Sequence, residues 1–71
     1  MDIRFLLGRN VARLRRQRKL SQEKLAAASG HSQQSISELE RGHRNATIDL
    51  IGDIARALNV HPIELFRPED R

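Results

Sequence analysis

Signals that start and stop helices lie so close together in the middle of the chain that they limit the folds open to it. Ser21 is a good N-cap, and Gly30 supplies the left-handed stop for the helix that follows it. Ser32 caps a new helix almost at once, and Gly42 ends that helix in turn. The sequence therefore predicts two short helices within about residues 21–41, joined by a very tight turn.

Apolar residues continue at helical spacing on both sides of this pair. An amphipathic helix is predicted over about residues 3–18. Its apolar stripe is Ile3, Leu7, Val11 and Leu14. Thr47 caps a fourth helix. The apolar face of that helix is Ile48, Ile51, Ile54, Ala55 and Leu58.

Pro62 then opens a last short helix that carries Ile63, Leu65 and Phe66. No segment alternates in the manner of a strand, and there is no linker or internal repeat. We therefore expect an all-α fold of five helices, in one domain that spans residues 1–71 and ends in a frayed tail over 67–71.

The chain is strongly basic for its size. Its formal net charge is +4, and eleven of its 13 basic residues are arginines, whose guanidinium group suits phosphate well. Six cations crowd into residues 9–19. Such a run is explained by a solvated helix face, or by a surface for nucleic acid, an anionic protein or a membrane. The absence of Trp and of any apolar run of about 18 residues argues against a membrane, so we expect a cytoplasmic protein.

Catalytic and metal-binding chemistry has little support in the sequence. The chain has no Cys, which excludes disulfides and thiolate ligands. Its histidines fall in predicted loops and lack the spacing of a metal site. They are His31, His43 and His61. So short a chain also has little room for a substrate pocket of about 300 Å³ or more. We expect no enzyme, no metal and no cofactor.

The second helix of the central pair begins with two neighbouring amide side chains. Gln33 and Gln34 follow the capping Ser32, so both should project from the exposed first turn. A side-chain amide can hydrogen-bond adenine through two atoms at once in the major groove. In a basic chain with almost no aromatic residues, these two glutamines indicate a protein that reads DNA bases.

The central pair also fits a family pattern. Its fixed positions are Ser21-Gln22-x-x-Leu25-Ala26-x-x-x-Gly30-x-Ser32-x-x-x-Ile36-Ser37-x-Leu39-Glu40-Arg41-Gly42. This pattern resembles the phage repressor and Cro type of helix-turn-helix regulator, the xenobiotic-response-element family. The resemblance covers roughly residues 8–66. The stretch Glu40-Arg41-Gly42-x-Arg44-Asn45-x-Thr47 is similar to controller proteins of restriction-modification systems.

The resemblance implies a lambda-repressor-like DNA-binding domain in which helices 2 and 3 form the helix-turn-helix. It implies a sequence-specific transcriptional regulator that binds a palindromic operator in double-stranded DNA as a homodimer, with helix 3 in the major groove. DNA binding would place the protein on the nucleoid. The alternative is an antitoxin that binds a toxin and regulates its own operon. The chain leaves no space for a ligand sensor, so we expect no small-molecule effector.

Roles for individual residues follow from the same resemblance. The residues that would face base edges are Gln33, Gln34, Ser35 and Glu38. Those that would contact or position phosphates are Arg15, Gln22, Ser37, Arg41, Arg44 and Asn45. The Glu38 carboxylate could accept a hydrogen bond from cytosine N4 or could simply face solvent. Ser37 could reach a phosphate or cap locally.

Two structural features are implied as well. Arg15 and Glu40 match a charged pair that ties the first helix to the third. At the surface such a pair is worth about 0–1 kcal/mol, whereas removal of one partner from a buried pair costs about 3–5 kcal/mol. The residues implied at a two-fold interface are Val60, Ile63 and Phe66.

Two histidines depart from the family pattern. His31 stands where a small apolar residue usually closes the turn, so that corner should be looser or sensitive to pH. His61 stands where Ser often caps the last helix. Neither position is among the implied base-reading residues.

Overall fold

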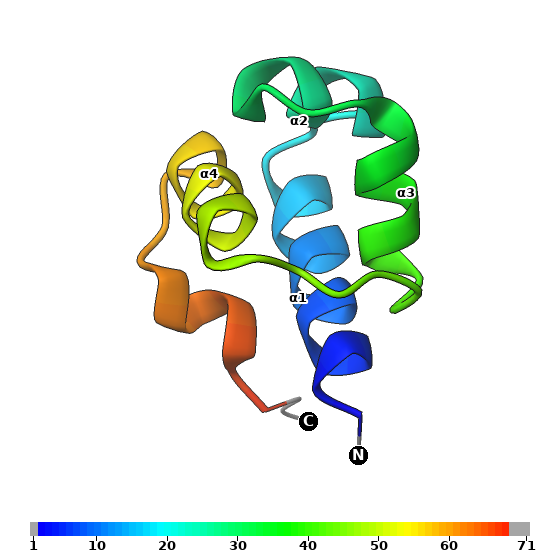
Figure 1. Cartoon of the computed structure of the whole chain (residues 1–71). Helices are drawn as coiled ribbons and strands as arrows, with labels where there is room; N and C mark the ends of the chain where they lie inside the picture. Colours follow the sequence, from blue (N-terminus) through cyan, green and yellow to red (C-terminus); the bar gives the residue numbers. More distant parts are fainter. Residues whose placement is uncertain (1, 69–71) are drawn as a thin grey trace.

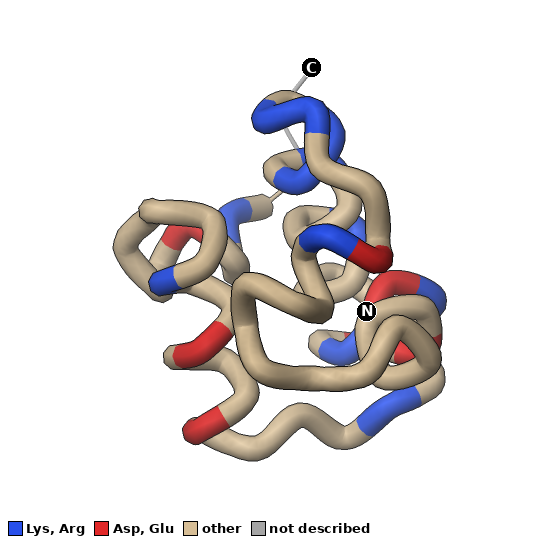
Figure 2. Tube along the Cα trace, turned by 90° about the horizontal axis from the view of Figure 1, so that it is seen from above, with Lys and Arg blue, Asp and Glu red and all other residues tan. Residues whose placement is uncertain are grey.

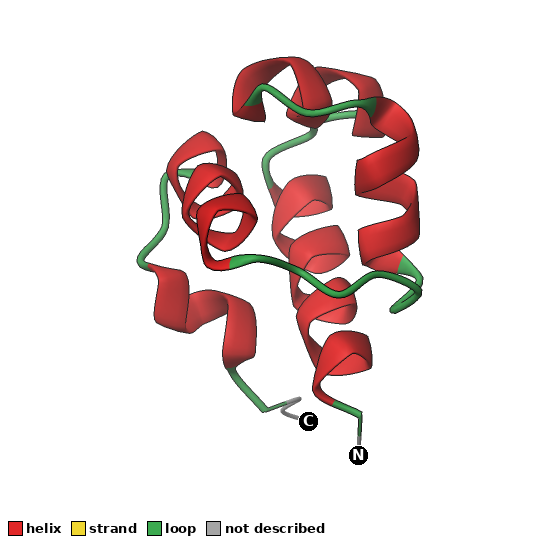
Figure 3. Ribbon diagram, viewed as in Figure 1, coloured by secondary structure: helices red, strands yellow, loops and turns green. Residues whose placement is uncertain are grey.

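The computed structural model describes residues 2–68 and contains helices but no strand within that range (Figures 1 and 3). Its elements in chain order are α1 (Ile3–Gln17), α2 (Gln22–Ser29), α3 (Gln33–Glu40), α4 (Ile48–Leu58) and the 3-10 helix η1 (Pro62–Phe66). The all-α prediction is confirmed. Of the expected tail, 67 and 68 follow η1 as exposed chain, while 69–71 lie outside the described residues. No helix among residues 2–68 has the length and apolar content that a membrane crossing needs.

The helices begin where the predicted caps stand. The side-chain oxygens of Ser21, Ser32 and Thr47 each accept a hydrogen bond from the backbone N–H three residues further on, at 3.0, 3.0 and 3.1 Å. Gly30 closes α2 in the left-handed region with φ 77°, and Gly42 follows α3 with φ 74°. Each cap satisfies an N–H that would otherwise lack a partner, which fixes the start of these short helices.

The core lies where the helices face one another. Its largest fully buried side chains are Val11, Leu25, Ile36, Leu39, Ile54, Leu58 and Leu65. Two predicted apolar-face positions are wrong, because Ile3 is 61% exposed and Ile48 is 83% exposed. Each is the first residue of its helix, where there are fewer neighbours to pack against. Leu50 is buried instead, since it lies four residues before Ile54 on the same face of α4.

The fifth predicted helix is a 3-10 helix rather than an α-helix. It has only five residues and begins with a proline, which donates no backbone hydrogen bond. His61 caps it, because its Nδ1 accepts from the backbone N–H of Ile63 at 3.1 Å. The buried Asn10 of α1 donates from Nδ2 to the carbonyl oxygens of Leu65 and Arg67, at 3.0 and 2.9 Å. These bonds hold η1 against α1.

α1 runs through the middle of the molecule (Figure 1). α2 lies across its upper end, α3 runs along one side, and α4 and η1 lie on the other. Gly8 of α1 lets α3 approach closely. A Cβ at this position would collide with the carbonyl oxygen of Leu39 and would lie 2.7 Å from that of Glu40. The missing side chain at Gly8 therefore helps to set the position of α3.

Candidate nucleic-acid interface

α3 has an apolar back and a polar outer face. Ile36 and Leu39 are buried against the other helices. Gln33 and Gln34 are exposed in its first turn. The helix is thus anchored on one side and offers amide groups on the other, which is the chemistry that complements adenine.

Several polar groups on this face already have partners. Gln34 Nε2 donates to Glu38 Oε2 at 3.2 Å, one turn further along the helix. Ser32 Oγ donates to Ser35 Oγ at 3.0 Å. Ser37, on the same helix, is half-buried. The predicted base-reading residues therefore lie together along α3, and two of them are linked to each other.

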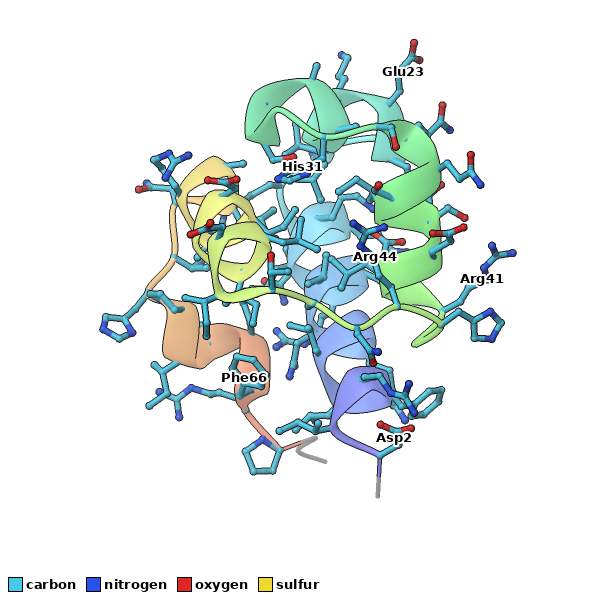
Figure 4. The ribbon with its side chains drawn as sticks, in the orientation of Figure 1. Asp2, Glu23, His31, Arg41, Arg44 and Phe66 are labelled. Carbon is cyan, nitrogen blue, oxygen red and sulfur yellow. The ribbon has the colours of Figure 1, made fainter. Side chains whose placement is uncertain are left out.

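The loop after α3 carries three of the predicted phosphate contacts, and two of these differ in direction. Arg41 is exposed and extends away from the helices, whereas Arg44 folds back toward α3 (Figure 4). Arg44 Nη1 lies 3.7 Å from Glu38 Oε1 in an ion pair. Arg44 Nε is buried and has no hydrogen-bond partner among residues 2–68. Arg44 is therefore held against the helix face in the free protein.

Arg4 is a cation at this edge that the sequence analysis missed. Its Nη1 donates to Oδ1 of Asn45 at 3.1 Å, which brings the start of α1 beside the loop. Its Nε and Nη2 donate to the Asp2 carboxylate at 3.2 and 2.8 Å. The hydrogen bonds from Arg4 lower the pKa of Asp2 to about 2. Nothing local in the sequence links Arg4 to Asn45, so only the folded chain reveals the contact.

Arg15, Gln22 and Glu40 form a polar cluster, which we call the α3 clamp. Arg15 donates from Nε and Nη2 to the two carboxylate oxygens of Glu40 at 2.6 and 3.1 Å. Gln22 Nε2 donates to Glu40 Oε1 at 3.0 Å. The side chains of Arg15 and Glu40 are only 12% and 6% exposed, so the pair is nearly buried. The α3 clamp joins α1, α2 and α3 and fixes the direction of the outer face of α3.

A group of basic residues lies at the end of α1, and further Lys and Arg positions are distributed over the molecule (Figure 2). Asp and Glu positions are spread over the other helices. The exposed basic residues at this end are Arg16, Arg18 and Lys19, while Arg15 beside them is paired with Glu40 in the α3 clamp. Such a group of positive charges favours an anionic partner.

The residues expected at a dimer interface differ in exposure. Ile63 is 58% exposed on η1. Val60 and Phe66 are only partly buried, and both pack against the core (Figure 4 labels Phe66). Ile63 is therefore the one of the three that offers most of its apolar surface to solvent.

His31 connects the turn between α2 and α3 to α4. Its Nε2 lies 3.0 Å from Oδ2 of Asp53, whose other oxygen accepts from Arg56 Nη2 at 2.8 Å. The hydrogen bonds from His31, and after it from Arg56, lower the pKa of Asp53. The turn between α2 and α3 is thus joined to α4 by a hydrogen bond in place of the apolar contact that is usual in the family pattern.

An open hollow of about 590 Å³ lies against α1 and is bordered by Glu40, by Glu64 of η1 and by the two residues that follow η1, so the chain has more room for a pocket than its length suggests. Its charged lining residues are Arg9, Arg13, Arg16, Arg67, Glu40 and Glu64. Arg67 donates to Glu64 at 2.9 and 3.1 Å, and these bonds lower the pKa of Glu64. No cluster of three potential metal ligands occurs among residues 2–68.

Comparison with known proteins places the chain in a family. The sequence profile of a family described as helix-turn-helix matches residues 11–65. The chain belongs to this helix-turn-helix family. It is 51% identical over 70 residues to the HTH-type transcriptional regulator y4dJ of Sinorhizobium fredii, with 99% of this chain and 91% of that protein covered. It is 42% identical to the control protein C.BamHI of Bacillus amyloliquefaciens, with 92% and 82% covered.

A solved structure gives the same answer for the fold. The restriction-modification controller protein C.AhdI from Aeromonas hydrophila superposes on this helix-turn-helix protein with a TM-score of 0.87 and 38% identity. The superposition covers 89% of this chain and 96% of that one. The resemblance to repressor and Cro-type regulators, including restriction-modification controllers, is therefore confirmed. These similar proteins are named as a transcriptional regulator, a control protein and a restriction-modification controller protein.

Proposed function

We propose that this helix-turn-helix protein is a sequence-specific transcriptional regulator that binds a palindromic operator in double-stranded DNA as a homodimer. α2 and α3 form its helix-turn-helix, and α3 enters the major groove. The geometry of α3 carries the proposal, because its apolar back is buried and the nearly buried α3 clamp fixes its direction. A reading helix needs this rigidity, since contacts to base edges depend on side-chain geometry.

The proposed contacts fall into two classes. The residues that read base edges are Gln33, Gln34, Ser35 and Glu38. The residues that contact or position phosphates are Arg15, Gln22, Ser37, Arg41, Arg44 and Asn45, and Arg4 joins them through its bond to Asn45. Phosphate contacts set the register on the duplex, while base contacts carry the sequence preference.

A two-fold dimer through η1 would place two copies of α3 about one DNA turn apart, roughly 34 Å. Ile63 supplies the exposed apolar surface for this contact, with Val60 and Phe66 beside it. The control proteins among the relatives support the narrower idea that the chain regulates a restriction-modification operon, on the nucleoid in the cytoplasm. They also favour this function over the antitoxin alternative.

Selection from random duplex DNA at about 150 mM salt tests the proposal. The wild-type chain should enrich an inverted repeat. The Gln33→Ala,Gln34→Ala variant should lose that enrichment, whereas Gln17→Ala, which truncates an exposed glutamine at the end of α1, should keep it. Failure of the folded wild-type chain to enrich any sequence would contradict the proposed function. A direct repeat or a single half-site would contradict the two-fold dimer alone.

A further inference from the structure

A carboxylate stands on the face of the molecule that is proposed to meet DNA. Glu38 lies on α3 with its side chain 34% exposed. Phosphates repel a carboxylate that approaches them, and a carboxylate that loses its hydrogen bonds pays a desolvation penalty. Glu38 should therefore weaken DNA binding unless a donor on the DNA compensates.

The contacts of Glu38 join one proposed base reader to one proposed phosphate contact. Its Oε2 accepts from Gln34 Nε2 at 3.2 Å, and its Oε1 lies 3.7 Å from Arg44 Nη1. Arg44 also buries its Nε without a hydrogen-bond partner among the described residues. The carboxylate is thus the anionic partner of Arg44 in the free protein, the role that a phosphate oxygen would take on DNA.

The ion pair between Arg44 and Glu38 is weak enough for another anion to replace the carboxylate. Arg44 and Glu38 are 36% and 34% exposed and their charged atoms are 3.7 Å apart, and ion pairs of this kind are weak. In the α3 clamp, by contrast, Arg15 and Glu40 are nearly buried and hydrogen-bonded through both carboxylate oxygens. A phosphate can therefore displace the partner of Arg44 far more easily than that of Arg15, which positions α3 while it stays bound to Glu40.

We propose that Glu38 is an internal competitor for DNA that suppresses binding to the wrong sequence. The proposal rests on the function proposed above for α3. On DNA, a phosphate takes Arg44 and a base edge takes Gln34, so the carboxylate loses both partners. A base pair that presents an amino group there, from cytosine N4 or adenine N6, restores a hydrogen bond to Glu38. Other sequences leave the carboxylate unpaired or leave Arg44 bound to it.

The Glu38→Gln variant tests this competition against a charge-matched control. Glu23→Gln removes the same charge from an exposed residue in the first turn of α2 (Figure 4). Dissociation constants are measured for the selected duplex and for a random-sequence duplex of the same length. Glu38→Gln should bind the random duplex up to about fivefold more tightly, the range that a weak ion pair allows, without a matching gain on the selected one. Glu23→Gln should change both affinities by the same factor.

Arg44 provides a second readout of the same competition. Arg44→Ala should weaken binding to the random duplex more in the Glu38→Gln background than in the wild-type background, because Glu38 no longer holds the guanidinium. The salt dependence of random-duplex binding should also become steeper in Glu38→Gln, by up to about one unit of logarithmic slope.

Three results would overturn the proposal, and they are distinguishable. If Glu38→Gln raised the affinity for both duplexes by the same factor, as Glu23→Gln should, then Glu38 would act only through the net charge of the protein. Loss on the selected duplex with no gain on the random one would make Glu38 a simple base contact. A folded wild-type chain that binds neither duplex would contradict the proposed function itself. Thermal unfolding followed by circular dichroism shows that each variant is folded.

Discussion

Glu40 accepts three hydrogen bonds while its side chain is only 6% exposed. Replacement of Glu40 should therefore lower the stability of the fold more than replacement of an exposed carboxylate. Glu40→Ala leaves the Arg15 guanidinium nearly buried without its partner. We expect the free energy of unfolding to fall by about 3–5 kcal/mol. Urea unfolding measures this change. Glu23→Ala, at an exposed position of α2, should stay within about 0.5 kcal/mol of the wild type.

Replacement of both charges separates the folding role of the α3 clamp from its role on DNA. Arg15→Met,Glu40→Leu leaves no unpaired charge, so most of the lost stability should return. The directional hydrogen bonds that orient α3 are gone, so affinity for the selected duplex should stay below that of the wild type. Wild-type affinity in this stable variant would show that the α3 clamp serves stability alone.

Asp53 should make stability depend on pH. Its pKa is lowered from the ordinary 3.8, first by the hydrogen bond from His31 and then by that from Arg56. A carboxyl with a lowered folded-state pKa contributes stability above the ordinary value and loses it as the pH falls through the folded-state pKa. The difference in Tm between wild type and Asp53→Asn should therefore be present above pH 3.8 and vanish in stronger acid. In a His31→Ala background the difference above pH 3.8 should be smaller, because Asp53 then keeps only the hydrogen bond from Arg56.

At the scale of helices, we expect an added methyl group to have opposite effects on stability at two glycines. A Cβ at Gly8 meets the backbone carbonyl oxygens of α3, whereas a Cβ at Gly52 of α4 meets nothing within 4 Å. Gly8→Ala should destabilise the fold by about 1–3 kcal/mol, because backbone must move. Gly52→Ala should stabilise it by about 0.5–1 kcal/mol through helix propensity. Thermal unfolding of the two variants measures the contrast, and equal effects would contradict the close α1–α3 approach.

The helix boundaries were predictable because caps are local. Ser21, Ser32 and Thr47 bond to backbone only three residues away, so a short stretch of sequence contains the whole interaction. Burial along α4 was predicted less well, since Ile48 and Leu50 are both apolar and only the packing of the first turn decides between them.

The candidate site was predictable only in part, because some of its contacts are local and others depend on how the helices pack. Gln33 and Gln34 are exposed as predicted, because their position after a cap settles it. The pairing of Glu38 with Arg44 depends on the path of a loop. The bond from Arg4 to Asn45 joins residues 41 positions apart, and that from Asn10 to Leu65 joins residues 55 apart. Such contacts follow from the packing of whole helices, and no local pattern announces them.

At the scale of the whole molecule, the proposed dimer depends on apolar surface that the monomer does not bury. Ile63 on η1 is 58% exposed, and Ile3 at the start of α1 is 61% exposed, so the two isoleucines are matched in exposure. Of these two isoleucines, only Ile63 belongs to the proposed two-fold interface. Ile63→Asp would place a charge at the centre of that contact, where an unpaired charge is costly. The dimer dissociation constant should rise about tenfold or more, while Ile3→Asp should leave it unchanged.

Sedimentation equilibrium of the three proteins measures the association directly. Ile63 buries little apolar surface in the monomer, so Ile63→Asp should remain folded. Ile63 belongs to η1 rather than to α3, so the variant should keep weak binding to a single half-site. Its affinity for the full inverted repeat should fall, since two linked reading helices bind more tightly than one. Equal dimer constants for Ile63→Asp and wild type would move the interface away from η1. Dissociation caused by Ile3→Asp instead would place it at the start of α1.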